Sequence, residues 1–358
     1  MKTYVKSRLV RNIFISLTLF LVAAFLLKES AAEFWTDETE QYRKLEEAQY
    51  VPELTANDLS KKGKIGLLLF GDSGWGNEDQ HAVAEGMWAS CKRNPCDLAI
   101  GLGDNIYPSG VTSSSDPMWQ LSFESPYKKF VEAAAPDFWM LVGNHDRRSS
   151  IDAQLRYTEQ SPIWKMPAQD YAIPGLPGWL NIYVLDTTFI AQGADVPTFQ
   201  SAFEESFEAQ LKRASVHLCD KPGWRILATH HPLISNGDPK NRFRENNVHD
   251  ALHPFIEHCG IHLVLSGHEH MQQHVEMEGV DYLIQGAASA TRAYAKPLQH
   301  DTALSRYLGY QLGFSYLSFT KRKMFLQFKD QEGSTLHVST LKRLDFERRR
   351  KQASKRFE

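Results

Sequence analysis

The stretch Gly101-Leu102-Gly103-Asp104-Asn105-Ile106-Tyr107 ends the apolar run Leu98 to Leu102 abruptly in an acid, an amide and a phenol. A short apolar run that stops at glycine is typical of a buried strand. Open α/β sheets bind their ligands in the crevice outside the carboxyl ends of the strands. A carboxylate at such an end is therefore well placed for function, and Asp104 is the central candidate.

Four other apolar runs end in the same way, in small residues followed by oxygen or nitrogen ligands. They are Ile65 to Phe70 before Gly71-Asp72-Ser73-Gly74, Phe138 to Val142 before Gly143-Asn144-His145-Asp146, Ile226 to Ala228 before Thr229-His230-His231, and Ile261 to Leu265 before Ser266-Gly267-His268-Glu269-His270. A single acid after a strand is usually a turn residue. Five strand ends that all bear Asp, Asn, His or Tyr favour a metal site instead.

The polar side chains at these ends form a set of candidate metal ligands: Asp72, Asp104, Tyr107, Asn144, His230, His268 and His270. Seven donors exceed the needs of one ion, so they predict two ions about 3.5–4 Å apart, with Asp104 as the bridge. Oxygen donors mixed with imidazoles suit iron, manganese or zinc. Tyr107 would bind only as tyrosinate, whose ordinary pKa of about 10 must be lowered by a strongly acidic ion, for which ferric iron is best.

The order of elements predicts an α/β (α+β) fold. Strand, crossover helix and strand alternate in the first half, where Asn77 and Gln80 form a helix start like a capping box, so parallel pairing is expected. Further helices are expected over Pro126 to Ala134 and Ile151 to Gln160, from Ser201 onward and over Asn247 to His258, and a strand over Leu180 to Thr187.

The last part of the chain changes character. Short alternating segments predict strands of a second, antiparallel sheet at His274 to Met277, Asp281 to Gln285, Phe314 to Phe319, Lys323 to Lys329 and Thr335 to Leu341. Such a chain can fold as two mixed sheets packed face to face with helices outside, a four-layer α/β/β/α sandwich.

The amino end reads as a targeting segment. Met1 to Arg11 has four Lys or Arg residues and no acid, and fifteen largely apolar residues follow from Ile13 to Leu27. That run is shorter than the ~20 residues needed to span a membrane comfortably, as in a signal peptide. Small residues at Ser30 and Ala32 permit cleavage, and an uncleaved anchor with a membrane tether through residues 13–27 is the alternative. We expect the body outside the cytoplasm, secreted, periplasmic or lumenal.

Charge is distributed unevenly. Residues 342–358 contain eight Lys or Arg against three acids, whereas the chain between the two basic ends has 40 acids against 28 bases. An acidic body argues against nucleic acid as the main partner, since phosphate binding needs a basic face. We expect the basic tail to be a solvated helix from Asp345 onward, with contact to anionic lipid headgroups as the alternative.

The cysteines fit an exported protein. Cys91, Cys96, Cys219 and Cys259 allow three pairings. We expect disulfides between Cys91 and Cys96 and between Cys219 and Cys259, with free buried thiols as the alternative. None of the four has the spacing of a zinc site.

In their order and spacing, the blocks that contain Asp72, Asp104, Asn144, His230 and His268 resemble the calcineurin-like metallophosphoesterase superfamily. Within it, Tyr107 three residues after Asp104 resembles the purple acid phosphatases, most closely the small, tartrate-resistant kind. The likeness runs from about Lys64 to about Leu341. It implies residues 64–341 as the metallophosphoesterase catalytic domain. The residue pattern of the remaining chain predicts 1–32 as signal peptide or signal anchor, 33–63 as connector and 342–358 as basic C-terminal tail.

The resemblance also implies a division of the ligands. Ferric iron would be held by Asp72, Asp104, Tyr107 and His270, and a divalent iron, zinc or manganese by Asp104, Asn144, His230 and His268. A metal-bound hydroxide would attack phosphorus in line, with no phosphoenzyme. His145 would bind phosphate oxygens or protonate the leaving alkoxide, and Asp146 would orient His145.

The function implied is an acid phosphatase acting on phosphate monoesters. The alternatives are a phosphodiesterase or nucleotide hydrolase of the same superfamily, and a metal-containing protein that binds without turnover. The last is disfavoured, because a binding protein has no need for two complete ligand sets and His145. Nothing in the sequence indicates the oligomeric state or the physiological substrate.

Two positions depart from the family pattern. Ser73 stands where these phosphatases commonly have tryptophan, and Pro239 falls where they have a further histidine on the substrate side. His249 is a possible substitute for that histidine. His231, His253, His258 and His262 are interpreted as structural or surface residues.

Overall fold

The computed structural model describes residues 52–192, 197–237, 242–293 and 303–354. The chain divides into two compact units, Met1–Ala48 and Gln49–Glu358, and all described residues belong to the second. The predicted targeting segment and the apolar run 13–27 lie outside the described residues. Among those described, no helix combines the length and apolar character needed to cross a membrane.

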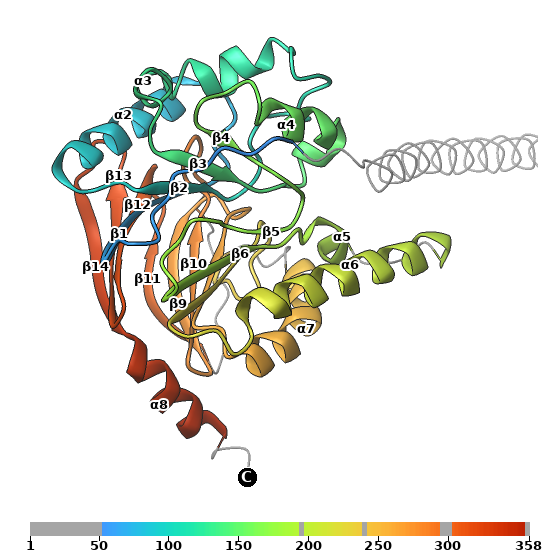
Figure 1. Cartoon of the computed structure of the whole chain (residues 1–358), viewed down its shortest axis with the longest axis vertical. Helices are drawn as coiled ribbons and strands as arrows, with labels where there is room; N and C mark the ends of the chain where they lie inside the picture. Colours follow the sequence, from blue (N-terminus) through green and yellow to red (C-terminus); the bar gives the residue numbers. More distant parts are fainter. Residues whose placement is uncertain (1–51, 193–196, 238–241, 294–302, 355–358) are drawn as a thin grey trace, which may run out of the picture. The chain divides into compact units, whose positions relative to one another are not determined.

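Within the described residues, two seven-stranded sheets form the centre of the domain (Figure 1). Sheet A has the spatial order β14 (Thr335–Lys342), β13 (Lys323–Asp330), β12 (Gly313–Thr320), β1 (Lys64–Phe70), β2 (Leu98–Gly101), β3 (Asp137–Met140) and β4 (Trp164–Lys165). Strands β1 to β4 are parallel, and β12 runs antiparallel to β1. Sheet A is therefore mixed.

Sheet B has the spatial order β11 (Leu304–Gly309), β9 (Gln272–Met277), β10 (Val280–Gln285), β8 (Leu263–Ser266), β7 (Trp224–Ala228), β6 (Leu180–Val184) and β5 (Tyr171–Ala172). Strands β6, β7, β8 and β10 are parallel, and β5, β9 and β11 are antiparallel to their neighbours. The predicted fold of two mixed sheets with helices is confirmed.

One topological expectation was wrong. The strands after residue 273 do not make a separate antiparallel sheet: β9, β10 and β11 extend sheet B, whereas β12, β13 and β14 extend sheet A. The division is explained by the pairing of β12 along β1, from Lys64 opposite Thr320 to Leu69 opposite Ser315. Their apolar side chains, such as Leu67 and Leu317, then enter one common core.

The helices lie outside the two sheets. They are α2 (Glu78–Arg93), α3 (Lys128–Ala133), α4 (Ile151–Tyr157), α5 (Thr188–Gln192), α6 (Pro197–Leu218), α7 (Arg242–Cys259) and α8 (Arg343–Ser354), with a π-helical turn at Gln120–Glu124 and a 3-10 turn at Asp146–Arg148. Helix α2 contacts β12, and α6 contacts β5 and β6. Figure 1 shows α2 and α3 beside sheet A, and α6 and α7 beside sheet B on the opposite side.

Alternation along β1 shows how the layers are built. Ile65, Leu67 and Leu69 belong to the core cluster that joins the facing surfaces of the two sheets. The side chain of Phe70, on the other face, packs against the rings of Tyr127 and Phe138. Because both faces of the strand are covered, the sequence is apolar throughout rather than alternating.

Helix starts were predicted with mixed success. The Asn77 side chain accepts a hydrogen bond from Gln80 N, as the capping pattern indicated. Helix α6 begins at Pro197 rather than Ser201, in keeping with the preference for proline in the first helical turn. Helix α7 begins at Arg242, five residues before the predicted start at Asn247.

The carboxyl-terminal helix is not simply solvated. In α8, Phe346 is buried and packs edge-on against Trp224, and Arg349 forms ion pairs with Asp281 and Glu276. The sequence of this helix is mostly basic, so it gave no sign that Phe346 is buried. The two predicted disulfides, Cys91–Cys96 and Cys219–Cys259, are both present.

Candidate metal centre

Five parallel strand ends bring the predicted ligands together. Asp72 follows β1, Asp104 follows β2, Asn144 follows β3, His230 follows β7, and His268 and His270 follow β8. Parallel strands deliver their carboxyl ends to one edge of each sheet. The seven side chains predicted as ligands meet there in two groups that share Asp104.

The first group surrounds the phenol of Tyr107. Tyr107 Oη lies 2.9 Å from Asp104 Oδ2, 3.2 Å from Asp72 Oδ1 and 3.3 Å from His270 Nε2. His270 Nε2 is also 3.6 Å from Asp72 Oδ1. Four donor atoms from three strand ends therefore converge on one point.

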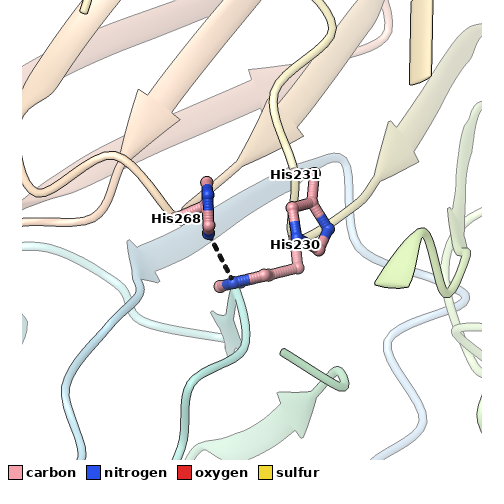
Figure 2. Close-up of side chains that lie close together, drawn as sticks. All are labelled: His230, His231 and His268. Atoms are coloured by element: carbon pink, nitrogen blue, oxygen red, sulfur yellow. Dashed lines mark hydrogen bonds between the residues drawn. The ribbon is translucent and has the colours of Figure 1, made fainter. Parts of the chain in front are cut away.

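The second group surrounds His230. Its Nε2 lies 3.1 Å from Asn144 Oδ1, 3.3 Å from His268 Nδ1 and 3.5 Å from Asp104 Oδ1. Figure 2 shows His230 and His268 pointing toward one another, with His231 beside them. The other ring nitrogen of His230 lies 2.7 Å from the carbonyl oxygen of Leu102, which fixes the ring orientation.

Three members of these groups have unusual backbones. Asp72, Asp104 and His268 have φ angles of 55°, 52° and 65°, in the left-handed region that residues with a Cβ rarely adopt. Each follows a glycine. Such conformations persist where the surroundings enforce them, and they cluster at functional sites.

Two glycines keep the centre compact. A Cβ at Gly143 would lie 2.2 Å from Asp104 N and Oδ1, and a Cβ at Gly267 would lie 2.6 Å from Asp72 Oδ2. A larger residue at either position would displace a candidate ligand. The glycine that precedes each polar residue in the sequence is thus explained by close approach.

The electrostatics of the two carboxylates are demanding. Asp72 and Asp104 are fully or almost fully buried. Burial, followed by the charge of Asp104, raises the pKa of Asp72 well above its ordinary value. Burial and the same two carboxylates raise the pKa of the Tyr107 phenol. A cation between these groups would reverse both effects.

Asp146 has a different set of contacts from the one predicted. Its carboxylate accepts hydrogen bonds from the backbone amides of Gly143, Asn105 and Ile106 and from the side chain of Gln154. The ring of His145, which Asp146 was expected to orient, instead places Nδ1 2.7 Å from the carbonyl oxygen of Pro108. Asp146 connects the loop after β2 to the loop after β3, because its carboxylate accepts hydrogen bonds from backbone amides of both loops. Burial and then the charge of Asp104 raise its pKa to about 7.

A cleft of about 500 Å³ opens over the two groups. His145 lines it, and burial lowers the pKa of this imidazole, with a smaller contribution from the Arg148 charge. Several lining residues were not singled out from the sequence, among them Trp75, Arg148 and Arg292. The two arginines are exposed.

Trp75 covers the phenol of Tyr107. The two rings stack with centroids 4.6 Å apart and an interplanar angle of 11°, and Trp75 stays 46% exposed. The family commonly has tryptophan where this chain has Ser73, and Trp75 supplies an aromatic ring two residues later. Ser73 itself is buried.

A model of the family described as calcineurin-like phosphoesterase matches residues 65–272 of the chain. The chain belongs to this family. The matched segment contains every residue of the two groups described above, so the resemblance seen in the sequence is confirmed.

Among the most similar relatives are named phosphatases. Tartrate-resistant acid phosphatase type 5 of Oryctolagus cuniculus is 29% identical over 68% of this chain and 78% of its own length. Purple acid phosphatase 7 of Arabidopsis thaliana is 26% identical over 78% of this chain and 86% of its own length.

Solved structures support the fold assignment of this family member. GAP50, the anchor in the inner membrane complex of Plasmodium, superposes with a TM-score of 0.65 and 17% identity over 78% of this chain and 89% of its own. The purple acid phosphatase PPD1 of yellow lupin superposes with a TM-score of 0.61 and 14% identity over 81% of this chain and 56% of its own.

Two histidines need a separate account. His231, interpreted as structural, lies against the centre: its ring is 4.5 Å from that of His268, and Thr187 Oγ1 lies 3.2 Å from its Nδ1. His249, considered as a substrate-side histidine, lies on α7, stacks on His253 and is not among the residues that line the cleft.

Proposed function

We propose that this calcineurin-like phosphoesterase is a dinuclear-metal acid phosphatase that hydrolyses phosphate monoesters. The observation that supports this most directly is the position of Asp104, whose Oδ2 faces Tyr107 while its Oδ1 faces His230. One carboxylate thereby belongs to both groups of donors. A shared carboxylate is what a pair of ions about 3.5–4 Å apart requires.

The donors fit two different cations. Asp72, Asp104, Tyr107 and His270 would hold Fe(3+), because a phenol beside two carboxylates ionises only next to a strongly acidic ion. Asp104, Asn144, His230 and His268 would hold a divalent ion, Fe, Zn or Mn, whose preferences match imidazole with amide and carboxylate oxygens. Asp72 and Asp104 are both buried, and the pKa of Asp72 is raised. A bound cation would offset the cost of burying these two carboxylates, which supports the assignment of two cations.

When bound, two such cations would supply an acidified water and neutralise charge on the attacking and leaving oxygens. The chain's own residues have separate tasks. His145 lines the cleft, and its Nδ1 lies 2.7 Å from the carbonyl oxygen of Pro108, so Nε2 of the protonated ring would be the atom that donates a proton to the leaving oxygen. Arg148 and Arg292 offer guanidinium groups to the phosphate oxygens.

A phosphodiesterase or nucleotide hydrolase of the same family is the second candidate. The exposed face of Trp75 and the two arginines of the open cleft would suit a ring and an additional phosphate. A protein that binds metal without turnover has less support, because it has no use for His145 above two ligand groups.

The same proposal covers the remainder of the chain. We assign residues 64–341 to the catalytic domain, 1–32 to a signal peptide or signal anchor, 33–63 to a connector and 342–358 to the basic tail. The two disulfides support an extracytoplasmic location. The partner expected is a phosphate ester rather than nucleic acid.

The decisive experiment is an assay of the purified protein with monoester and diester substrates across acidic pH, paired with elemental analysis. We expect at least two metal ions per chain and a preference for monoesters. Preference for diesters would favour the second candidate, and two bound ions without hydrolysis of either substrate would leave only the binding protein.

A further inference from the structure

A second group of metal-ligand side chains lies away from the cleft, where α7 meets the turn between β9 and β10. His253 and Glu257 stand four residues apart on α7, and Glu278 lies in the turn of the hairpin. We propose that His253, Glu257 and Glu278 bind a divalent cation of the zinc class, which fastens the helix to the hairpin.

The distances suit one ion. His253 Nε2 lies 3.7 Å from Glu257 Oε2 and 3.7 Å from Glu278 Oε2, and the three donor atoms all lie within 4.8 Å of one another. Donors about 2.0–2.2 Å from a tetrahedral zinc ion are separated by about 3.3–3.5 Å. Shifts of a few tenths of an ångström would bring His253 Nε2 to this distance from each carboxylate oxygen. A shift of at most about 1.3 Å would do the same for the two carboxylate oxygens.

The charge of the cluster also favours a bound cation. Two carboxylates face one imidazole, and within the described part of the chain neither Glu257 nor Glu278 has another cationic partner. The side chains are 68% and 31% exposed, and that of His253 is 28% exposed. A cation can therefore enter from solvent and keep a water at its open position.

His249 adds a neighbouring donor. It precedes His253 by four residues on the same helix, and the two rings stack with centroids 4.9 Å apart. Two histidines with this spacing on one helical face can bind a single zinc ion. Nδ1 of His249 lies 3.2 Å from Asp250 Oδ1, and its Nε2 is buried without a hydrogen-bond partner among the described residues.

This site is independent of the proposed catalytic centre. None of its residues lines the cleft, and the whole of β9 separates Glu278 from the segment of His268 and His270. The bound cation would act on stability, because a ligand of the folded chain alone shifts the unfolding equilibrium by mass action.

The test compares the full chain with three variants that each remove one donor: His253→Gln, Glu257→Gln and Glu278→Asn. Asparagine is chosen at position 278 because the φ of 52° there is tolerated best by asparagine, aspartate and glycine. Glu132→Gln is the matched control, since Glu132 also pairs at four-residue spacing on a helix surface, but with Lys128.

Elemental analysis after dialysis against micromolar zinc should find one zinc ion fewer in each donor variant than in the wild type and in Glu132→Gln. Zinc at about a hundred times its Kd should raise the unfolding midpoint of the wild type by about 5 °C and leave that of the donor variants unchanged. Retained phosphatase activity shows that the variants are folded. Equal zinc content and equal shifts in the wild type, Glu257→Gln and Glu278→Asn would overturn the proposal.

Discussion

Tyr107 donates a hydrogen bond of 2.9 Å from its Oη to Asp104 Oδ2, the carboxylate three residues before it. The loop after β2 therefore brings its own acid and its own phenol to one point. Asp72 follows the neighbouring strand β1, and its Oδ1 lies 3.2 Å from Tyr107 Oη. A metal ion in place of the phenol proton would be bound by the Tyr107 oxygen and by both carboxylates.

The first prediction concerns this phenol. Tyrosinate bound to ferric iron absorbs visible light, so the purified wild-type protein should be coloured. Tyr107→Phe should abolish the band while leaving the fold intact, because only the Oη atom is removed from a ring packed on Trp75. Visible absorption and iron content measured together check this, and a band that survives in Tyr107→Phe would contradict the assignment.

The second prediction concerns the shared carboxylate. Asp104→Ala removes a donor from both groups, so it should reduce turnover by about a hundredfold or more and lower the content of both metals. Asp152→Asn is a suitable control, since Asp152 pairs with Arg156 on an exposed face of α4. Unchanged turnover in Asp104→Ala would refute a two-metal mechanism.

Much of this centre could be read from the sequence because strand ends have a strong local signature. An apolar run, a glycine and a polar donor occur together at Asp72, Asp104 and His268, and the structure gives the reason: each of these residues has a left-handed backbone. The glycines that precede them are required by close contacts. Local pattern and local geometry agree, so the residues alone indicate that these side chains lie at one edge of the sheets.

Arg292, Trp75 and the partner of His145 could not be predicted, because their positions depend on contacts across the fold. The Arg292 backbone amide donates a hydrogen bond to the carbonyl oxygen of His270. This contact holds the segment that follows β10 beside the cleft, which Arg292 lines. The sheet to which β12 belongs likewise depends on pairing with β1, a segment some 250 residues earlier. The residue pattern of β12 does not indicate which of the two sheets it joins.

The third prediction concerns the two arginines of the cleft. Neither guanidinium group is hydrogen-bonded to a candidate metal-ligand side chain within the described residues. Arg292→Gln and Arg148→Gln should therefore raise KM for phosphate esters, by about tenfold for the loss of one charge-assisted contact. Metal content should stay at the wild-type level. Arg322→Gln, at an exposed position in the turn between β12 and β13, serves as the control for a general loss of positive charge. An effect confined to kcat would show that the arginines do not bind ground-state phosphate.

The fourth prediction concerns Asp146. Its carboxylate holds the backbone amides of Gly143 and Asn105, which border Asn144 and Asp104. Asp146→Asn replaces one carboxylate oxygen, a hydrogen-bond acceptor, by an NH2 group that cannot accept from those backbone amides. The loops that hold Asn144 and Asp104 should then be less well fixed, so metal affinity should fall by about 10- to 100-fold. Excess metal in the assay should then restore much of the turnover. Turnover that stays low at saturating metal would mean that Asp146 acts on the substrate instead.

The fifth prediction concerns the disulfides. Cys219 lies just after α6 and Cys259 ends α7, with a sequence separation of 40, whereas Cys91 and Cys96 are separated by 5. A cross-link stabilises a protein largely by restricting the unfolded chain, and more so for the longer loop. Replacing Cys219 and Cys259 together by serine should therefore cost about 4 kcal/mol of unfolding free energy, against about 2 kcal/mol for Cys91 and Cys96. Denaturant unfolding of both double variants checks this, and a smaller loss for the Cys219–Cys259 pair would show that loop length does not govern their contributions.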